Sequence, residues 1–347
     1  GRLRPARSAA PSTVSPGSAT NDCPVGTRVI WGMSKGCHEV AARTGMSGLF
    51  AYPHRMDQRC FIAGCGYTGL RLARRLRPRW QVSALARSET AVTRLAAEGI
   101  EPLRAELDEA LPCALLGPSV EGAVLAWFVP PPEAGTTDPR LERFLAAIGP
   151  ARPSLLLYTS TTGVYGDTGG ATVSEDSPVA PGNDRARRRV AAEAAAQAWC
   201  AEREVRCVVL RVPGIYGPGR LPLDRLRRRE PALQPEDAGP GNRIHVDDLV
   251  SACVAAIERP VRGIFNVTDG NPASTTEFLQ RTAAIAGLPP PPLVALADAP
   301  GSISPGMLAF LRERRRVDNR RMREELGFEP RHARLDDGIA ASLAEKQ

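Results

Sequence analysis

Three glycines near residue 65 have the spacing of a phosphate-binding turn. The motif is Gly64-Cys65-Gly66-Tyr67-Thr68-Gly69, with an apolar strand pattern before it and a helical pattern after it. In this context the first glycine permits a tight turn, the second lets the backbone approach a pyrophosphate, and the third lets the helix pack close to the strand. The helix N-terminus then directs its amides at the anion. The sequence therefore predicts a dinucleotide site at Gly64, Gly66 and Gly69, with Tyr67 and Thr68 beside it.

The residues after the second strand pattern indicate which dinucleotide is bound. The pattern at 81–86 ends in Arg87 and Ser88. NAD-binding domains tend to have an acidic residue here, which accepts hydrogen bonds from the ribose 2′-hydroxyl. An arginine instead offers a cation and planar donors to a 2′-phosphate. The sequence favours NADP, bound by Arg87 and Ser88, and leaves NAD open, because Arg87 could also be a surface arginine.

Strand and helix patterns alternate from Met56 onward, and this order predicts the fold. Strand patterns cover 61–63, 81–86, 122–129, 155–158 and 205–210, and helix patterns cover 70–76, 90–98, 140–148 and 187–202. Alternation implies right-handed crossovers and a parallel sheet covered on both faces. We expect an α/β protein with a Rossmann-type doubly wound parallel sheet over 56–217. A small, mostly helical C-terminal lobe is expected over 218–347, with 240–268 returning to the Rossmann core.

The first 55 residues differ in composition from the rest of the chain. They are rich in Arg, Ser, Pro, Ala and Gly, contain no acidic residue before Asp22, and show no sustained periodicity. Met56 opens directly onto the first strand pattern. The segment is interpreted either as an over-extended reading upstream of the natural start or as an organellar transit peptide. In both cases we expect residues 1–55 to be unfolded.

The distribution of basic residues argues against nucleic acid as a partner. The formal net charge is +7, but apart from Lys35 and Lys346 the basic residues are arginines spread along the chain. The basic run at 225–229 lacks interleaved aromatics and is expected to be a solvated helix face. We therefore expect a small-molecule substrate and no nucleic acid.

The eight cysteines show no C-x-x-C and no histidine at metal-ligand spacing, so we expect reduced thiols and no metal. No run of about 18 apolar residues indicates a membrane span. From the reduced thiols and the lack of a membrane span we expect a cytoplasmic location, or an organellar one if residues 1–55 are a transit peptide. A homodimer is left open.

Several further blocks occur in a fixed order along the chain. They are T-S-T-T-G-V-Y-G-D at 159–167, E-D-S-P-V-A-P at 175–181, L-R-V-P-G-I-Y-G-P-G at 210–219, R-I-H-V-D-D-L at 243–249, F-N-V at 265–267, and D-N followed by L-G-F-E-P within 318–330. Together with the glycine motif they resemble the extended short-chain dehydrogenase/reductase family, also described as the NAD-dependent epimerase/dehydratase family. The resemblance covers 59–338 and implies a Rossmann fold. It also implies that Val129, Arg189 and Pro213 contact the cofactor.

The resemblance breaks down at the residues that perform acid–base chemistry in that family. There, a Y-x-x-x-K motif begins four residues after the proline matched by Pro181; the tyrosine exchanges a proton with the carbonyl oxygen and the lysine binds the nicotinamide ribose. This sequence has Arg185 and Arg189 at these two places. An arginine cannot exchange a proton near neutral pH, because its pKa stays above ~12. The pattern resembles the YeeZ-like atypical branch, which lacks the tyrosine.

Other polar residues could take part in the chemistry. Thr161 matches the family's third polar residue, which hydrogen-bonds the substrate oxygen, although a threonine capping a strand end fits equally well. Tyr165, His245 and Asp247 are the candidates for a replacement proton donor. Tyr165 could be a packing residue, and His245 lies just before a helix that Asp247 or Asp248 would cap.

Two functions are consistent with these residues. The first is an NADP-dependent oxidoreductase or epimerase that acts on a small polar or nucleotide-linked substrate through a degenerate R-x-x-x-R site. The second is a non-catalytic sensor or scaffold that binds NADP(H) without turnover.

Overall fold

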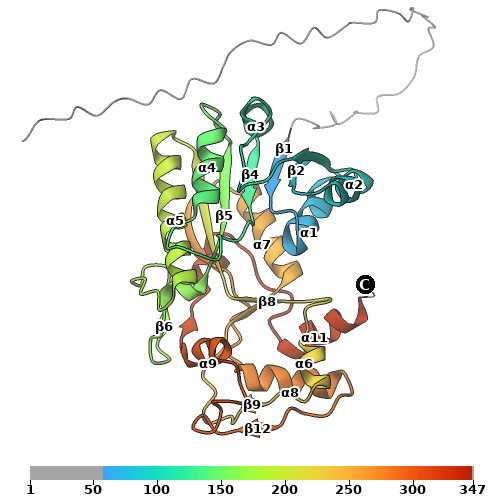
Figure 1. Ribbon diagram of the computed structural model, residues 1–347, viewed down its shortest axis with the longest axis vertical. Coiled ribbons are helices and arrows are strands. Elements are labelled where there is room, and N and C mark those ends of the chain that lie inside the picture. The colour runs from blue at the N-terminus through green and yellow to red at the C-terminus, as the bar shows by residue number, and fades with distance from the viewer. Residues whose placement is uncertain (1–57, 346–347) are drawn as a thin grey trace, which may run out of the picture. The chain divides into compact units, whose positions relative to one another are not determined.

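A seven-stranded parallel sheet forms the centre of the structure, a computed structural model that describes residues 58–345 (Figure 1). The leader predicted at 1–55 lies outside the described residues. The strand order is β11-β7-β5-β4-β1-β2-β3, and all neighbours are parallel. The strands are β1 (Arg59–Ala63), β2 (Gln81–Ala86), β3 (Glu101–Arg104), β4 (Val124–Trp127), β5 (Leu155–Thr161), β7 (Arg206–Val212) and β11 (Gly263–Asn266).

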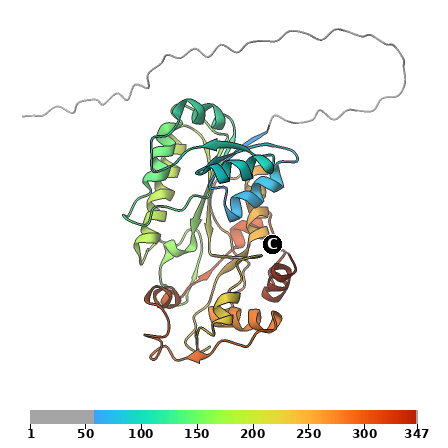
Figure 2. The same cartoon turned by 45° about the vertical axis from the view of Figure 1, so that its right-hand side comes forward.

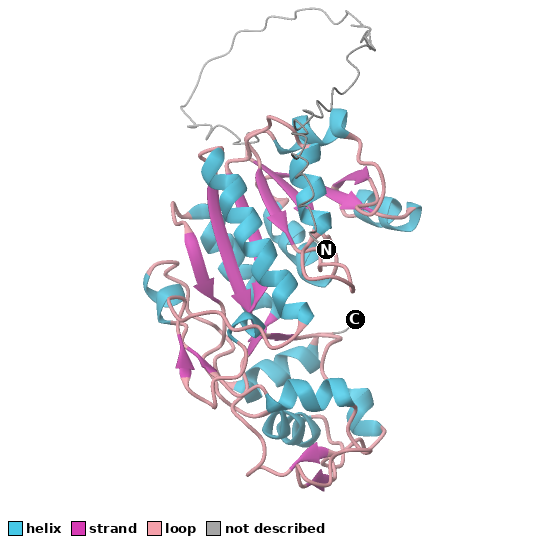
Figure 3. Cartoon of the chain, turned by 60° about the vertical axis from the view of Figure 1, so that its left-hand side comes forward, coloured by secondary structure: helices cyan, strands magenta, loops and turns pink. Residues whose placement is uncertain are grey.

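Helices cover both faces of this sheet (Figure 3). Side chains alternate along β1, so that Ile62 packs against one set of helices and Phe61 against the other. The first set is α1 (Tyr67–Leu76), α2 (Glu89–Ala97), α7 (Val246–Glu258) and α10 (Arg320–Glu324), and the second is α3 (Cys113–Val120), α4 (Pro139–Ala147) and α5 (Asp184–Glu202). The predicted Rossmann-type α/β fold is confirmed.

The strand order reverses beside β1. The chain runs outward from β1 to β3 and then returns to add β4 on the other side of β1. In open α/β sheets, ligands bind at the carboxyl ends of the strands at such a switch point. The loops after β1 and β4 therefore lie where a dinucleotide site is expected.

A smaller lobe follows β8 (Gly214–Tyr216), which pairs with β10 (Arg243–His245). Its helices are α6 (Leu223–Arg227), α8 (Thr275–Ile285), α9 (Pro305–Arg312) and α11 (Leu335–Ala344), joined by the short pair β9 (Ala232–Leu233) and β12 (Leu293–Val294). Helix α11 packs against α8 (Figure 2). Tyr216, Phe278 and Ile339 share a small core there. Two short strands, β6 (Thr172–Val173) and β13 (Arg316–Val317), pair beside the lobe. None of the helices within 58–345 has the length and apolarity needed to cross a membrane.

Some elements differ from the sequence prediction. The patterns gave no element between 98 and 122, but β3 and α3 lie there. Strand β3 is a partly exposed edge strand that contains Pro102, and α3 contains Gly117 and Pro118, so neither has a clear periodicity. Helix α5 begins at Asp184 rather than at 187, because the Asn183 side chain accepts a hydrogen bond from the Ala186 amide at 2.9 Å.

Candidate functional site

The glycine loop after β1 has two tightly packed glycines and one open one. Gly64 has φ +90°, and a Cβ there would lie 2.8 Å from the Val129 nitrogen after β4. A Cβ on Gly69 would lie 2.5 Å from the Gly64 oxygen. A Cβ on Gly66 would meet no atom within 4 Å. Gly64 and Gly69 are therefore required by packing, whereas Gly66 leaves its surface free at the start of α1, where backbone amides can face an anion.

Tyr67 links this loop to the segment that follows β8. Its hydroxyl donates a hydrogen bond to the Pro218 oxygen at 2.9 Å, and the Arg220 guanidinium lies 4.0 Å from the centre of its ring. Thr68 is buried beside it. The loop is thus held against residues about 150 positions away in the sequence.

Arg87 and Ser88 lie at the carboxyl end of β2. Arg87 is 81% exposed, and its Nε lies 3.8 Å from a carboxylate oxygen of Glu106, which follows β3. The Ser88 hydroxyl accepts a hydrogen bond from the Ala91 amide at 3.2 Å and caps α2. The Arg87 guanidinium is accessible to a ligand but has an anionic neighbour.

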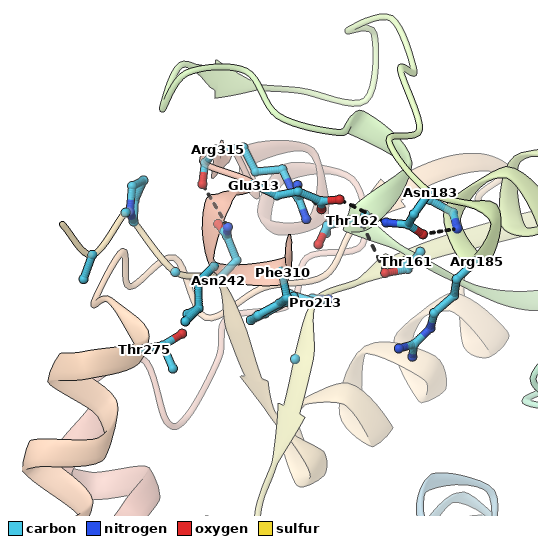
Figure 4. A pocket seen from close by; sticks show the side chains of 18 residues that line it. Thr161, Thr162, Asn183, Arg185, Pro213, Asn242, Thr275, Phe310, Glu313 and Arg315 are labelled. Atoms are coloured by element: carbon cyan, nitrogen blue, oxygen red, sulfur yellow. Dashed lines mark hydrogen bonds and ion pairs between the residues drawn. The ribbon is translucent and has the colours of Figure 1, made fainter. Parts of the chain in front are cut away.

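A cavity of about 300 Å³ lies at the carboxyl end of β5 (Figure 4). Its wall includes three residues singled out from the sequence, Thr161, Arg185 and Pro213. Thr161 ends β5, Arg185 lies in the first turn of α5, and Pro213 lies between β7 and β8. The parallel strands bring them to one edge of the sheet, although 52 positions separate the first from the last.

The cavity also contains a polar cluster that the sequence did not indicate. The Asn183 amide donates to one Glu313 oxygen at 3.0 Å, and Arg315 Nη1 donates to the other at 2.9 Å. Arg315 is buried and also donates to the Gly166 oxygen at 2.6 Å. Asn183 carries a local signal, since it precedes a helix start. Glu313 and Arg315 are brought in by tertiary structure from about 130 positions away.

Arg189 does not line this cavity but packs against β5. Its Nη1 donates to the Thr159 oxygen at 2.8 Å and to the Tyr158 hydroxyl at 3.2 Å. Burial raises the pKa of Tyr158 to about 12, so its hydroxyl stays protonated at neutral pH. The two arginines of R-x-x-x-R therefore have different surroundings, Arg185 in the cavity and Arg189 beside the strand.

None of the three candidate proton donors, Tyr165, His245 and Asp247, lines the cavity. The Tyr165 hydroxyl is buried and donates to the Asn266 side-chain oxygen at 2.8 Å. His245 is buried; burial, followed by the neighbouring His332, lowers its pKa to about 4. Its Nδ1 accepts a hydrogen bond from the Asp247 amide at 3.2 Å.

The expected cap by Asp247 or Asp248 is wrong, because the His245 side chain itself caps α7. The Asp248 carboxylate instead accepts hydrogen bonds from the Arg331 and His332 amides, both at 2.9 Å. A carboxylate so placed fixes the loop before α11 rather than the start of its own helix.

His245, Asp247 and His332 form the one group within 58–345 whose geometry could hold a metal ion. Their potential ligand atoms lie within 4.8 Å of one another. The Arg71 Nε lies 4.0 Å from the Asp247 carboxylate, and the positive end of the α7 dipole lies at the same place. These positive charges disfavour a cation there.

Comparison with known proteins gives the same family by sequence and by fold. Residues 140–268 match the model of the NAD dependent epimerase/dehydratase family. The chain is 32% identical over 224 residues to a 3-diazoavenalumate denitrifying reductase from a Streptomyces species, covering 60% of this chain and 73% of that protein. It is 28% identical over 281 residues to protein YeeZ from Escherichia coli, covering 77% of this chain and 94% of YeeZ.

Solved structures extend the comparison over the described fold. A conserved protein of unknown function from Silicibacter pomeroyi has 31% identity and a TM-score of 0.70, over 83% of this chain and 98% of that one. A UDP-glucuronic acid 4-epimerase from Bacillus cereus, solved in complex with NAD, has 16% identity and a TM-score of 0.66, over 82% and 97% of the two chains, which shows the shared fold alone. With the glycine loop and the seven-stranded sheet, these likenesses show that the chain belongs to the NAD-dependent epimerase/dehydratase family of extended short-chain dehydrogenases/reductases, in its YeeZ-like branch.

Proposed function

We propose that the protein is an NADP(H)-dependent oxidoreductase or epimerase that acts on a small polar or nucleotide-linked substrate. The observation that carries this proposal is the pairing of an open glycine loop, at Gly66, with a cavity at the carboxyl end of β5. In this assignment the loop residues from Gly64 to Gly69, together with Val129, Arg189 and Pro213, contact the cofactor. The name of the Streptomyces relative, a reductase, supports a hydride transfer.

Within this proposal the cavity supplies charge stabilisation rather than a strong acid. Glu313 is the only carboxylate in the described cavity wall, and no Tyr, His or Cys lines it. Arg185 supplies positive charge to the bound substrate, and Thr161 donates a hydrogen bond to the substrate oxygen on which negative charge develops. Arg189, bonded to Thr159, holds α5 against β5 and lies at the position of the family's ribose-binding lysine. For Tyr165 we propose a packing role.

We further propose that residues 56–217 form the cofactor-binding domain and 218–347 the substrate-side lobe, with 240–268 part of the core. Strand β11 pairs with β7 in the main sheet, which supports this return. Residues on both sides of the boundary line the cavity, Arg185 from the first part and Glu313 from the second. A substrate bound there would be held between the two.

A sensor that binds NADP(H) without turnover is the second candidate. It is favoured by the engagement of Arg189 with Tyr158 and Thr159 and by the absence of a tyrosine at Arg185. The sensor would still hold the cofactor on the glycine loop.

Oxidation of NADPH in the presence of small carbonyl compounds would identify an oxidoreductase. Interconversion of nucleotide-sugar epimers by the cofactor-loaded protein would identify an epimerase, which returns the hydride in each cycle and consumes no NADPH. The matched variant is Gly66→Val, because a Cβ on Gly66 would meet no atom within 4 Å and the added side chain would occupy the space that the pyrophosphate needs. We expect one of these two activities, and we expect Gly66→Val to lose both binding and turnover with an unchanged circular dichroism spectrum. Binding with neither activity would identify the sensor, and unchanged binding by Gly66→Val would remove the glycine loop from the assignment.

A further inference from the structure

The cavity at the carboxyl end of β5 contains three charged side chains, of which two neutralise each other. Glu313 and Arg315 form an ion pair at 2.9 Å, with 16% and 8% of their side chains exposed. Asn183 also donates to Glu313. These groups form a closed polar cluster on one side of the cavity (Figure 4).

Arg185 is the third charged group and has no hydrogen-bond or ion-pair partner among residues 58–345. Its neighbours on the same helix differ in this respect: Arg187 pairs with Asp184 at 2.5 Å, and Arg188 donates to the Gly135 oxygen at 2.7 Å. The described cavity wall therefore has a net charge of about +1, on Arg185, whose side chain lines the cavity and is exposed. A guanidinium binds carboxylates and phosphates through two parallel hydrogen bonds.

Another part of the cavity wall is apolar. Phe310 on α9 is 55% exposed, although aromatic side chains of this size are usually buried. It lines the cavity with Leu311, Pro213 and Pro240. An aromatic ring favours flat partners, through stacked or edge-to-face contact. The cavity thus combines one unpaired cation with an exposed ring.

We propose, resting on the proposed function, that the substrate is a small acid with a flat, apolar body. Its anionic group pairs with Arg185 and its body packs on Phe310. The volume of about 300 Å³ agrees with this size, since it lies at the lower end of the range for small-molecule sites. A nucleotide-linked substrate would have to extend well beyond the described cavity.

The test is calorimetric binding to the full-length protein with three probes: trans-cinnamate, its neutral counterpart cinnamamide, and UDP-glucose. Cinnamate is expected to bind about tenfold to a hundredfold more tightly than cinnamamide, as one charge-assisted interaction implies. Arg185→Gln should remove this difference, because it weakens cinnamate binding far more than cinnamamide binding. Phe310→Ala should weaken both probes. Arg187→Gln is the control, because Arg187 lies two residues away on the same helix but does not line the cavity.

Several outcomes would overturn the assignment. Equal affinities for cinnamate and cinnamamide, no binding of either, or an equal loss in Arg187→Gln would remove Arg185 as an anion site. Tight binding of UDP-glucose that depends on Arg185 would instead identify a nucleotide-linked substrate. The binding measurement needs no turnover. The proposed substrate class can therefore be refuted while the proposed function still stands on the Gly66-dependent binding of NADPH.

Discussion

At the scale of single residues, cofactor choice is predicted to depend on Arg87 and its neighbour Glu106. The two side chains approach to 3.8 Å at the ends of adjacent strands. A charge-assisted hydrogen bond to a 2′-phosphate is worth ~1.5–3 kcal/mol, so Arg87→Ala should lower NADP affinity roughly tenfold to a hundredfold and leave NAD affinity nearly unchanged. Glu106→Gln should raise NADP affinity, because it removes a competing anion.

Calorimetry with both cofactors at two salt concentrations checks this prediction. The NADP preference should shrink as salt rises, because an exposed charge pair is screened. If the unmodified protein binds NADP and NAD equally, Arg87 is only a surface arginine.

Site residues that belong to a local sequence motif could be predicted. Site residues that meet only in the folded structure could not. Gly64 and Gly69 were identified from spacing, and their close contacts in the structure agree with the packing that the motif requires. Asn183 and Glu313 meet only because the segment after α9 folds back to the start of α5. No periodicity or motif contains that information, so the polar side of the cavity had no sequence signal.

At the scale of elements, α5 is held to the sheet by a buried ion pair. Glu193 on α5 accepts a hydrogen bond from Arg211 Nη2 on β7 at 2.7 Å, and each side chain is 5% exposed. The Ser160 hydroxyl on β5 donates to the same carboxylate. Removing one partner of a buried pair leaves an uncompensated charge, which costs about 3–5 kcal/mol.

Glu193→Ala should therefore lower the free energy of unfolding by about 3–5 kcal/mol in urea titrations. Arg187→Ala, which breaks an exposed pair on the same helix, should cost less than about 1 kcal/mol. Similar losses in the two variants would show that the Glu193–Arg211 pair does not hold the helix.

The central elements could be predicted and the peripheral ones could not. Strands β1, β2, β5 and β7 are apolar runs bounded by turn residues, and this is the pattern of a buried parallel strand. Strand β3 has only one neighbour, and its pattern of exposed ends leaves little apolar signal. Strand β3 forms because it pairs with β2 in the folded protein, and the local sequence pattern contains no information about that pairing.

At the scale of the whole molecule, two buried groups give opposite dependences of stability on pH. Burial raises the pKa of Asp269 to about 7. The protonated Asp269 carboxyl therefore stabilises the folded state at low pH, and this stabilisation is lost as the pH rises from about 4 through 7. Burial lowers the pKa of His245 to about 4. The neutral His245 ring therefore stabilises the folded state above about pH 6.5, and this stabilisation is lost as the pH falls through about 4. The two effects oppose each other in the same interval.

Denaturant titrations between pH 4 and pH 8 can separate these contributions. The stability of Asp269→Asn relative to the unmodified protein should rise by on the order of a few kcal/mol from pH 4 to pH 7 and then stay constant. His245→Asn keeps a capping side chain, and its relative stability should rise as the pH falls below 6.5. A relative stability of Asp269→Asn that does not change with pH would show that the carboxyl titrates normally in the folded state.

The position of Glu313 near the end of the chain also affects the order in which the sheet and the cavity can form during synthesis. Between them, β1 to β4 and the glycine loop use only residues 59–129, whereas the cavity wall is incomplete until 310–315 have been added. The Arg314 amide then donates to the Asp167 carboxylate at 2.9 Å, and β13 pairs with β6. Because domains fold as units, from the N-terminal side as the chain is synthesised, the main sheet, whose last strand β11 ends at Asn266, can form on the ribosome before residues 310–315 complete the cavity wall.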